Sequence, residues 1–387
     1  AGRLLFDLNQ IIGYKIDVRI VARLLVLLPL LWVEGVWAVD CPDTNYDLRT
    51  QAQVDSFVAT GCDTISGSLI IASNSYYRAN LDLGGLTNLI SVGGMLMVTN
   101  QATTNLDGLA NLTNVGGDLY ISVMHELENI DGLVSLTSIG GKFEIKDNPV
   151  LADLDGLANL SSVGDDLLVS RHAILSNIDG LLSLTSVGGD LLIFENDALT
   201  NIDGLVGLKS VTRNLEVSRN PVLRNVDGLS NLTSVGGSVS NVLAIYDNAA
   251  LQNVDGLVSL TRLTAFLRIS NNGSLENVDG LVNLTSVVGD LRIYNNSRLT
   301  NLDGLASLTS IGGGLRLWGS SLTNCQGLAL VLGWPSGPSN VSGGIDISSV
   351  GVGCRSVSEI LASVSGPTKP VIVEATGSGG LISLGLT

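Results

Sequence analysis

The chain has 387 residues, of which 14% are charged and 4% aromatic, and its formal net charge is −16. This acidity argues against nucleic acid and against an anionic membrane face as partners, because both are bound by basic surfaces. The 46 glycines, beside abundant Leu, Val and Ile, favour many short strands joined by tight turns.

Residues 1–38 have the features of a targeting segment. Arg19 and Arg23 form a positive flank, an apolar stretch follows, and Ala38 ends a small-x-small pattern that suits cleavage. The alternative is an uncleaved membrane anchor, but the segment contains Glu34, and a spanning helix needs about 20 largely apolar residues. We therefore expect a signal peptide and an extracellular or cell-surface location, with membrane contact only if the segment stays attached.

The four cysteines lie in two groups, Cys41 with Cys62 and Cys325 with Cys354. Paired cysteines at both ends of a repeat region are typical of an extracellular protein with disulfide-stapled caps. Three pairings are formally open, and the pairing within each group is favoured because the others would join opposite ends of a long rod. We assign residues 39–66 to an N-terminal cap and 351–387 to a C-terminal cap and tail.

A 24-residue repeat fills the region between the caps, residues 67–350. Its most regular element is Asp-Gly-Leu, and every interval is 24 residues except one of 28 between Asp227 and Asp255. The four extra residues lie near 238–242. The aspartates are Asp107, Asp131, Asp155, Asp179, Asp203, Asp227, Asp255, Asp279 and Asp303.

Alternating apolar pairs mark one strand in each repeat, as at Leu215 and Val217. Side chains alternate between the faces of a strand, so we expect such pairs to point inward and to stack coil on coil at about 4.8 Å. Twelve pairs occur, from Leu69/Ile71 to Ile345/Ile347. The pattern predicts an all-β fold, a parallel right-handed β-solenoid of about 12 coils, and excludes a helical repeat.

Two polar columns accompany the strands. The first is an asparagine after each strand, which we interpret as an inward ladder that satisfies backbone groups at a corner: Asn148, Asn196, Asn220, Asn248, Asn272 and Asn296. Met124, His172 and Ser320 take this position in other coils, so we interpret His172 as a corner substitute and not as a catalytic base.

The second column is the aspartate of each Asp-Gly pair, often with an asparagine two residues earlier. We interpret it as an Asx-type turn in which the glycine takes the left-handed conformation. The alternative is a row of calcium ligands, which is disfavoured because no coil adds further acidic ligands. No metal or cofactor is expected.

The beginning of this region resembles a receptor L domain. The resemblance rests on Cys41, a predicted short helix over Thr50–Val58, and the segment Gly61–Ile71. Later coils, such as Leu184–Leu191, are similar to fungal cell-wall and sporulation proteins of the same style. The resemblance covers about residues 41–350 and implies a disulfide-capped, secreted protein used in recognition or wall integrity. This chain has about twice as many coils as one receptor L domain.

Asn-x-Ser/Thr sequons mark candidate glycosylation sites. Asn272 also lies in a sequon, but its inward position should leave it unmodified. The repeat contains Leu-Thr, so the Asn-Leu-Thr pattern could equally arise from the repeat itself. The candidates are Asn111, Asn159, Asn231, Asn283, Asn295 and Asn340.

The outward positions of the long strands offer one candidate binding face. Its residues concentrate arginine and aromatic side chains in the C-terminal third of the repeats, and they are Arg268, Arg292, Arg316, Tyr246, Tyr294 and Trp318. Three like charges at strand spacing repel one another, and an anionic partner would relieve them. We predict a protein or acidic glycan ligand. The alternative is an ordinary solvated sheet face.

These patterns predict a non-catalytic binding, adhesion or cell-wall-organising protein, and no enzyme. Glu144 and Glu216 lie three coils apart, too far to act as a catalytic pair. A self-assembling extracellular subunit is the main alternative to a monomer. An ice-binding protein is disfavoured because Lys209 and Arg262 interrupt the Thr-Ser row.

Overall fold

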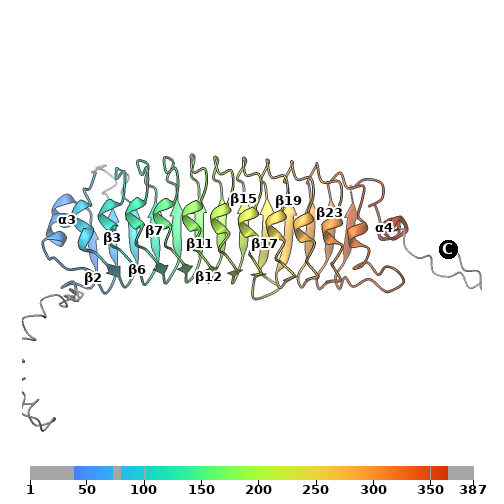
Figure 1. Ribbon diagram of the computed structural model, residues 1–387, viewed down its shortest axis with the longest axis horizontal. Coiled ribbons are helices and arrows are strands. Elements are labelled where there is room, and N and C mark those ends of the chain that lie inside the picture. Colours follow the sequence, from blue (N-terminus) through green and yellow to red (C-terminus); the bar gives the residue numbers. More distant parts are fainter. Residues whose placement is uncertain (1–38, 73–79, 100–101, 349, 365–387) are drawn as a thin grey trace, which may run out of the picture. The chain divides into compact units, whose positions relative to one another are not determined.

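The computed structural model describes residues 39–72, 80–99, 102–348 and 350–364. These residues form coils with three sides each, and the coils stack on one another in a single row (Figure 1). From Asp40 onward these residues belong to one unit. The predictions for residues 1–38 and for the tail beyond 364 lie outside the described residues.

The first side is a parallel sheet in which thirteen described strands follow one another in chain order. Its interior pairs are in register, for example Leu191 beside Leu215 and Ile193 beside Val217. The predicted parallel β-solenoid is therefore confirmed. The strands are β1 (Tyr46–Leu48), β3 (Leu69–Ala72), β5 (Leu96–Thr99), β7 (Leu119–Ser122), β9 (Phe143–Lys146), β11 (Leu167–Ser170), β13 (Leu191–Phe194), β15 (Leu215–Ser218), β17 (Val242–Tyr246), β19 (Phe266–Ser270), β21 (Leu291–Tyr294), β23 (Leu315–Trp318) and β24 (Ile345–Ser348).

The predicted inward pairs are fully buried from β3 to β23. The prediction is wrong for β24, where Ile345 is 36% exposed and Ile347 is only partly buried. β24 is the last strand of the sheet and pairs only with β23, so its outer side has no described strand against it. Strand β1, at the other end, is an element that the repeat pattern did not reveal.

The second side consists of two-residue strands that carry the Ser-Val pairs of the repeat. They form an eight-stranded and a three-stranded sheet, and the break falls beside the four extra residues of the 28-residue coil. The eight are β2 (Thr64–Ile65), β4 (Ser91–Val92), β6 (Asn114–Val115), β8 (Ser138–Ile139), β10 (Ser162–Val163), β12 (Ser186–Val187), β14 (Ser210–Val211) and β16 (Ser234–Val235). The three are β18 (Arg262–Leu263), β20 (Ser286–Val287) and β22 (Ser310–Ile311).

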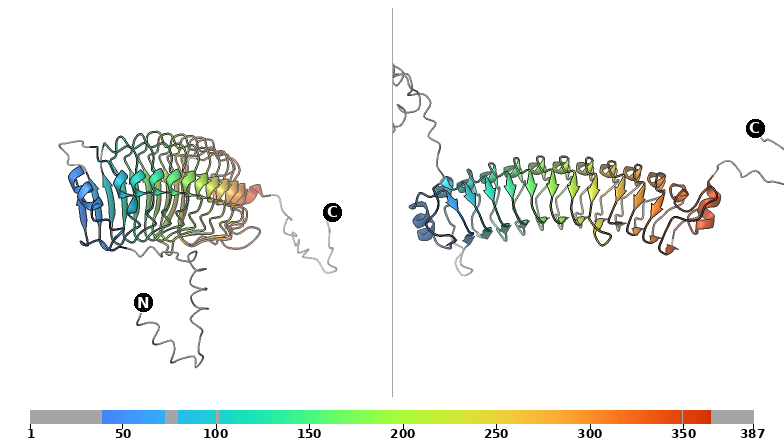
Figure 2. Two further views of the ribbon diagram at one scale, coloured as in Figure 1. Left: turned by 60° about the vertical axis from the view of Figure 1, so that its left-hand side comes forward. Right: turned by 90° about the horizontal axis from the view of Figure 1, so that it is seen from below.

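The third side is a row of short 3-10 helices, and the Asp-Gly-Leu segments form η2 to η10 of this row (Figures 1 and 2). They are η1 (Gly84–Asn88), η2 (Asp107–Leu109), η3 (Asp131–Leu133), η4 (Asp155–Leu157), η5 (Asp179–Leu181), η6 (Asp203–Leu205), η7 (Asp227–Leu229), η8 (Asp255–Leu257), η9 (Asp279–Leu281), η10 (Asp303–Leu305) and η11 (Gln326–Leu328).

The predicted left-handed glycine in this turn is wrong. None of these glycines has a positive φ. Glycine is required by close approach instead, because a Cβ on Gly204 would lie 1.9 Å from the carbonyl oxygen of Ile178 in the preceding coil. An Asx turn is present, but its acceptor is the side chain two residues before the aspartate and not the aspartate itself: the Asp203 N–H donates to Asn201 Oδ1 at 3.1 Å.

Left-handed backbone occurs at another position, the first residue after the long strands β7 to β21. Eight residues other than glycine have φ between 53° and 61° there. They are Val123, Asp147, Arg171, Glu195, Arg219, Asp247, Asn271 and Asn295. The conformation turns the chain so that the next residue, the corner asparagine, points inward.

The corner asparagines form the predicted ladder, and all six are fully buried. Asn220 is typical, since its Nδ2 donates to the carbonyl of Ile193 at 3.1 Å and its Oδ1 accepts the N–H of Asn196 at 3.1 Å. His172 takes the same place, with Nδ1 at 3.1 Å from the carbonyl of Asn148 and Nε2 at 3.2 Å from that of Ile145. Its interpretation as a corner substitute is confirmed.

Both predicted disulfides are present. Cys41–Cys62 lies beside helix α3 (Gln51–Val58), whose N-cap Thr50 accepts from the N–H of Gln53. Val54 and Phe57 of α3 are buried and cover the N-terminal end of the core.

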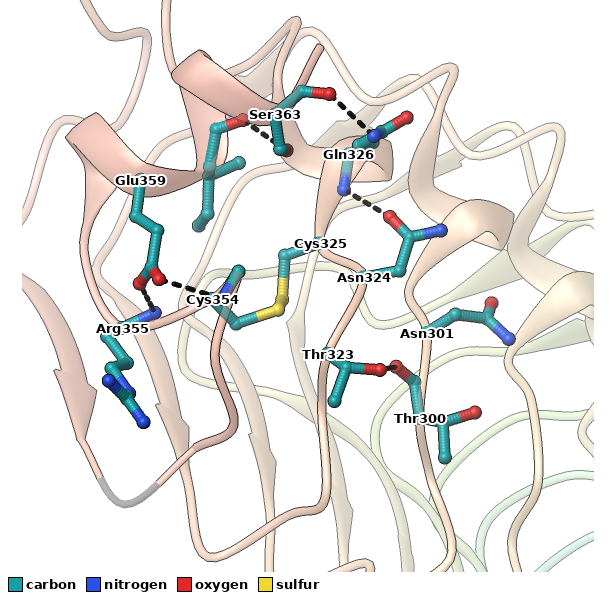
Figure 3. Close-up of a disulfide and its surroundings, with 12 residues drawn as sticks. Thr300, Asn301, Thr323, Asn324, Cys325, Gln326, Cys354, Arg355, Glu359 and Ser363 are labelled. Carbon is teal, nitrogen blue, oxygen red and sulfur yellow. Dashed lines mark hydrogen bonds between the residues drawn. A yellow bond between two sulfur atoms is a disulfide. The ribbon is translucent and has the colours of Figure 1, made fainter.

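The second disulfide, Cys325–Cys354, joins the last 3-10 helix to the segment before helix α4 (Val357–Ser363) (Figure 3). Glu359 accepts the N–H groups of Gly353 and Arg355, both at 2.8 Å, and Gln326 Nε2 donates to the carbonyl of Ser363 at 2.8 Å. These bonds hold α4 against η11, an arrangement that the repeat did not predict.

Candidate ligand-binding face

The structure brings the six predicted binding residues together on the outward face of four neighbouring strands. Arg268, Arg292 and Arg316 are register partners in β19, β21 and β23. The aromatic residues Tyr246, Tyr294 and Trp318 end β17, β21 and β23. We call these six residues the Arg–aromatic cluster.

Planar groups in this cluster stack along the solenoid. The guanidinium carbon of Arg268 lies 4.1 Å from the ring centroid of Tyr246 and 5.5 Å from that of Tyr294. Tyr294 and Trp318 are stacked, with centroids 4.3 Å apart and an interplanar angle of 12°. Cation–π and stacking contacts of this kind hold the side chains in one arrangement before any ligand arrives.

The arginines differ in how much of their charge is already compensated. Arg292 donates to Asp290 at 2.6 Å, and Arg268 Nε donates to Ser270 Oγ at 3.0 Å. The N–H of Gly314 and the charge of Arg292 lower the pKa of Asp290, which stays ionised. Part of the predicted repulsion is therefore relieved within the protein. Arg316 is exposed between two fully buried leucines.

Serines separate several of the large side chains on this face. Ser170, Ser218 and Ser270 occupy outward positions of their strands, yet all three are fully buried. The register explains the difference, since Ser218 lies between Phe194 and Tyr246, which cover it from both sides. The result is a row in which aromatic rings alternate with covered serines.

Glu216 extends the cluster toward the middle of the rod, a role that the sequence did not reveal. Its Oε1 accepts from Tyr246 Oη at 2.5 Å and from Ser218 Oγ at 2.7 Å. Burial and the bond to Glu216 raise the pKa of Tyr246. The hydroxyl therefore stays protonated and fixes the ring that supports Arg268.

A charge ladder runs beside the sheet in the left-handed column. Arg171 and Arg219 both donate to Glu195, at 2.9 and 2.8 Å. Hydrogen bonds continue this row: Asn271 Nδ2 donates to Asp247 Oδ1 at 2.7 Å, and Asn295 Nδ2 donates to Asn271 Oδ1 at 3.0 Å. The signal was present in the sequence as alternating charge at 24-residue spacing. These arginines form ion pairs with Glu195, whereas Arg316 makes no ion pair within the described residues and has Asp346 as its register partner in β24.

The sequon asparagines at the 3-10 corner are exposed and hydrogen-bonded to the coil before. Each Nδ2 donates to a backbone carbonyl, as Asn159 does to Val134 at 2.8 Å and Asn231 to Val206 at 2.8 Å. The amide thus has a structural role in its coil, which favours the repeat as the source of the pattern. Asn272 is fully buried, as predicted. Glycosylation stays a prediction.

The carboxylates considered for catalysis are engaged elsewhere. Burial would raise the pKa of Glu144, but Lys142 and Lys146 outweigh it and hold the pKa below its ordinary value. Burial lowers the pKa of His172. Among the described residues, no group of three or more His, Cys, Asp or Glu side chains could hold a metal ion. A shallow cavity of about 150 Å³ beside Arg262 has neither carboxylate nor imidazole in its lining.

These features define a parallel β-solenoid with a preformed polar–aromatic face. The family model of the receptor L domain matches residues 61–119, which span the first coils and end before the Arg–aromatic cluster. No curated protein matches the chain. The match and the repeat fold are typical of non-catalytic, ligand-binding repeat proteins. No described helix is long and apolar enough to cross a membrane.

Proposed function

We propose that this protein is an extracellular or cell-surface binding module whose Arg–aromatic cluster takes an anionic ligand, an acidic glycan or an acidic protein surface. Adhesion, recognition and wall organisation are the roles that such a module serves. The observation that carries the proposal is the stack of Tyr246, Arg268, Tyr294 and Trp318 beside the exposed Arg316. The two disulfides support an oxidising compartment.

The chemistry of the cluster fits an interface centre. Arginine and aromatic residues are enriched at such centres and contribute most of the binding energy there. The stacked arrangement also lowers the entropy that binding would otherwise cost, because the long side chains are held before the ligand arrives. The cluster lies outside the coils matched by the receptor L domain model, so it is specific to this part of the chain.

The test is a variant with Arg268→Ser, Arg292→Ser and Arg316→Ser, measured for binding to an array of acidic polysaccharides and extracellular proteins. We expect at least a 100-fold loss of affinity for the ligand that the unaltered protein selects, since an arginine at the centre of an interface contributes about 1 to 2 kcal/mol.

The matched control is Arg171→Ser, Arg213→Ser and Arg219→Ser, which removes the same charge from side chains that pair with carboxylates of the protein. Its binding should stay within about twofold, because these residues contribute only surface ion pairs. Equal losses in both variants would show that net charge and not the cluster determines binding, and unchanged binding in the first variant would refute the proposal.

A self-assembling extracellular subunit is the second candidate. It is favoured by the partly exposed Ile345 and Ile347 on the terminal strand β24, because an uncovered strand can pair with another chain. The mass of the purified protein in solution separates the two candidates: monomeric for a binding module, polymeric for an assembling subunit.

A further inference from the structure

We propose that the row of 3-10 helices is a second docking surface, which accepts a basic, amphipathic polypeptide segment of a partner protein. This surface lies on a different side of the coil from the Arg–aromatic cluster (Figure 2). Its partner chemistry is opposite to that of the cluster, so the proposal goes beyond the function proposed above.

An apolar ridge runs along this side. The residue after each Asp-Gly-Leu is aliphatic in most coils, and five of the fourteen exposed large hydrophobic residues of the described chain lie in this one column. They are Val134 (45%), Leu182 (52%), Val206 (38%), Val258 (38%) and Val282 (44%). The leucine just before each of them is fully buried. The core therefore does not need these side chains. Together with Ala158 they form two apolar stretches, one from Val134 to Val206 and one at Val258 and Val282, which Ser230 separates in the column.

A row of carboxylates lies beside the ridge. The nine aspartates that begin η2 to η10 are exposed, and no ion pair within the described residues reaches any of them. The turn does not require their charge, because the side chain two residues earlier caps the N–H and because Gln326 begins η11 in the same way.

The carboxylates also repel one another. Burial and the neighbouring carboxylates of the row raise the pKa of Asp227, and the same two causes act on Asp255. A side chain that the turn does not require, and whose charge is unfavourable at Asp227 and Asp255, suits a partner that brings positive charge.

The apolar ridge and the row of aspartates together indicate the chemistry of the partner. A small cation would neutralise carboxylates but leave the aliphatic side chains exposed. A second copy of this chain would bring the same acidic row, and its net charge of −16 opposes that contact. A polypeptide segment with aliphatic residues on one side and Lys or Arg beside them satisfies both features.

The experiment uses the full chain and two synthetic peptides of equal length and charge, one a Leu/Lys amphipathic sequence and the other a Lys/Ser sequence. We expect the Leu/Lys peptide to bind at least tenfold more tightly. Two variants should each weaken its binding about tenfold: Asp179→Asn with Asp203→Asn and Asp227→Asn, and Leu182→Ser with Val206→Ser. The first variant keeps the shape of every side chain and should fold normally.

Glu126→Gln with Glu128→Gln and Glu276→Gln is the matched control, since it removes three exposed charges that do not belong to the 3-10 helices. Its affinity should be unaltered. The proposal is overturned if the control weakens binding as much as the aspartate variant, if the Lys/Ser peptide binds equally well, or if neither variant has an effect. Dimerisation of the chain through this side, or calcium binding that the aspartate variant abolishes without any peptide binding, would equally overturn it.

Discussion

The corner asparagine links six of the coils to their neighbours through buried hydrogen bonds. The corner needs a donor for a carbonyl of the preceding strand and an acceptor for the N–H of the preceding corner, and a short amide provides both. His172 serves this place less well. Both of its ring nitrogens face carbonyl oxygens, but a neutral imidazole has only one N–H, so the ring can donate to only one of the two.

Restoring the amide with His172→Asn should raise stability by about 1 kcal/mol at neutral pH. The gain should grow in acid. Burial lowers the pKa of His172 in the folded protein, so the unfolded chain takes up a proton that the folded chain does not, and wild-type stability falls as the pH drops below about 6.5.

Thermal unfolding at pH 7 and pH 5 measures both effects, with the exposed His125→Asn as control. A stability difference between wild type and His172→Asn that does not change with pH would contradict the buried, neutral imidazole.

At the scale of one element, the 28-residue coil is the irregular one. Its extra residues, Ser238 to Asn241, form a loop in which Asn241 Oδ1 accepts the N–H groups of Gly237 and Ser238. The two sheets of short strands end on either side of this loop, at β16 and β18. The loop therefore interrupts one side of the coil while the long sheet continues through β17 without a break.

Deleting residues 238–241 joins Gly237 to Val242 and recreates the spacing of the other coils. We expect the variant to fold, with a midpoint of thermal unfolding equal to or slightly above that of the full chain, because a shorter loop loses less entropy on folding. Hydrogen exchange at Leu263 should slow as β16 and β18 pair. A large loss of stability would show that the loop is structural.

The long strands and the corner column were predictable because each repeats a pattern that burial enforces. The two-residue strands and 3-10 helices were not, since segments this short show no periodicity. The conformation of the glycine in Asp-Gly-Leu was predicted wrongly. A left-handed turn and a close approach between coils both require glycine, so the sequence alone does not distinguish them.

The candidate site was predictable only as a set of positions. Strand register placed Arg268, Arg292 and Arg316 in one column, as expected. Their contacts were not foreseen: Asp290 reaches Arg292 along the same segment, two residues away, and Glu216 reaches Tyr246 from the preceding coil. Side-chain rotamers, and not the repeat, determine these contacts.

For the whole solenoid, stability should be distributed coil by coil. Each coil contacts its neighbours, so a solenoid behaves as a one-dimensional chain of units whose ends need protection. The N-terminal end has α3 and Cys41–Cys62, whereas the C-terminal end has α4 and Cys325–Cys354.

Cys325→Ser with Cys354→Ser should reduce stability by about 3 kcal/mol, the loop-closure value for a loop of this size. The loss should be local. We expect amide exchange to accelerate in β23 and η11. It should stay unchanged in β11, which lies six coils away from β23.

Hydrogen exchange followed by mass spectrometry measures this, and the pair Cys41→Ser with Cys62→Ser should accelerate exchange at the opposite end. Uniform acceleration along the solenoid would contradict independent coils.

The asparagine ladder has a direction, and that direction matters while the chain is being made. Each corner amide bonds backward, to the coil before it, so the N–H of Asn196 has no partner until Asn220 has been synthesised. Ribosomes add about 5 to 20 residues each second, so a growing coil waits for seconds until the next one completes it. The most recently synthesised coil therefore always lacks its partner. The ladder is completed by Ser320, whose hydroxyl accepts the N–H of Asn296 at 3.3 Å.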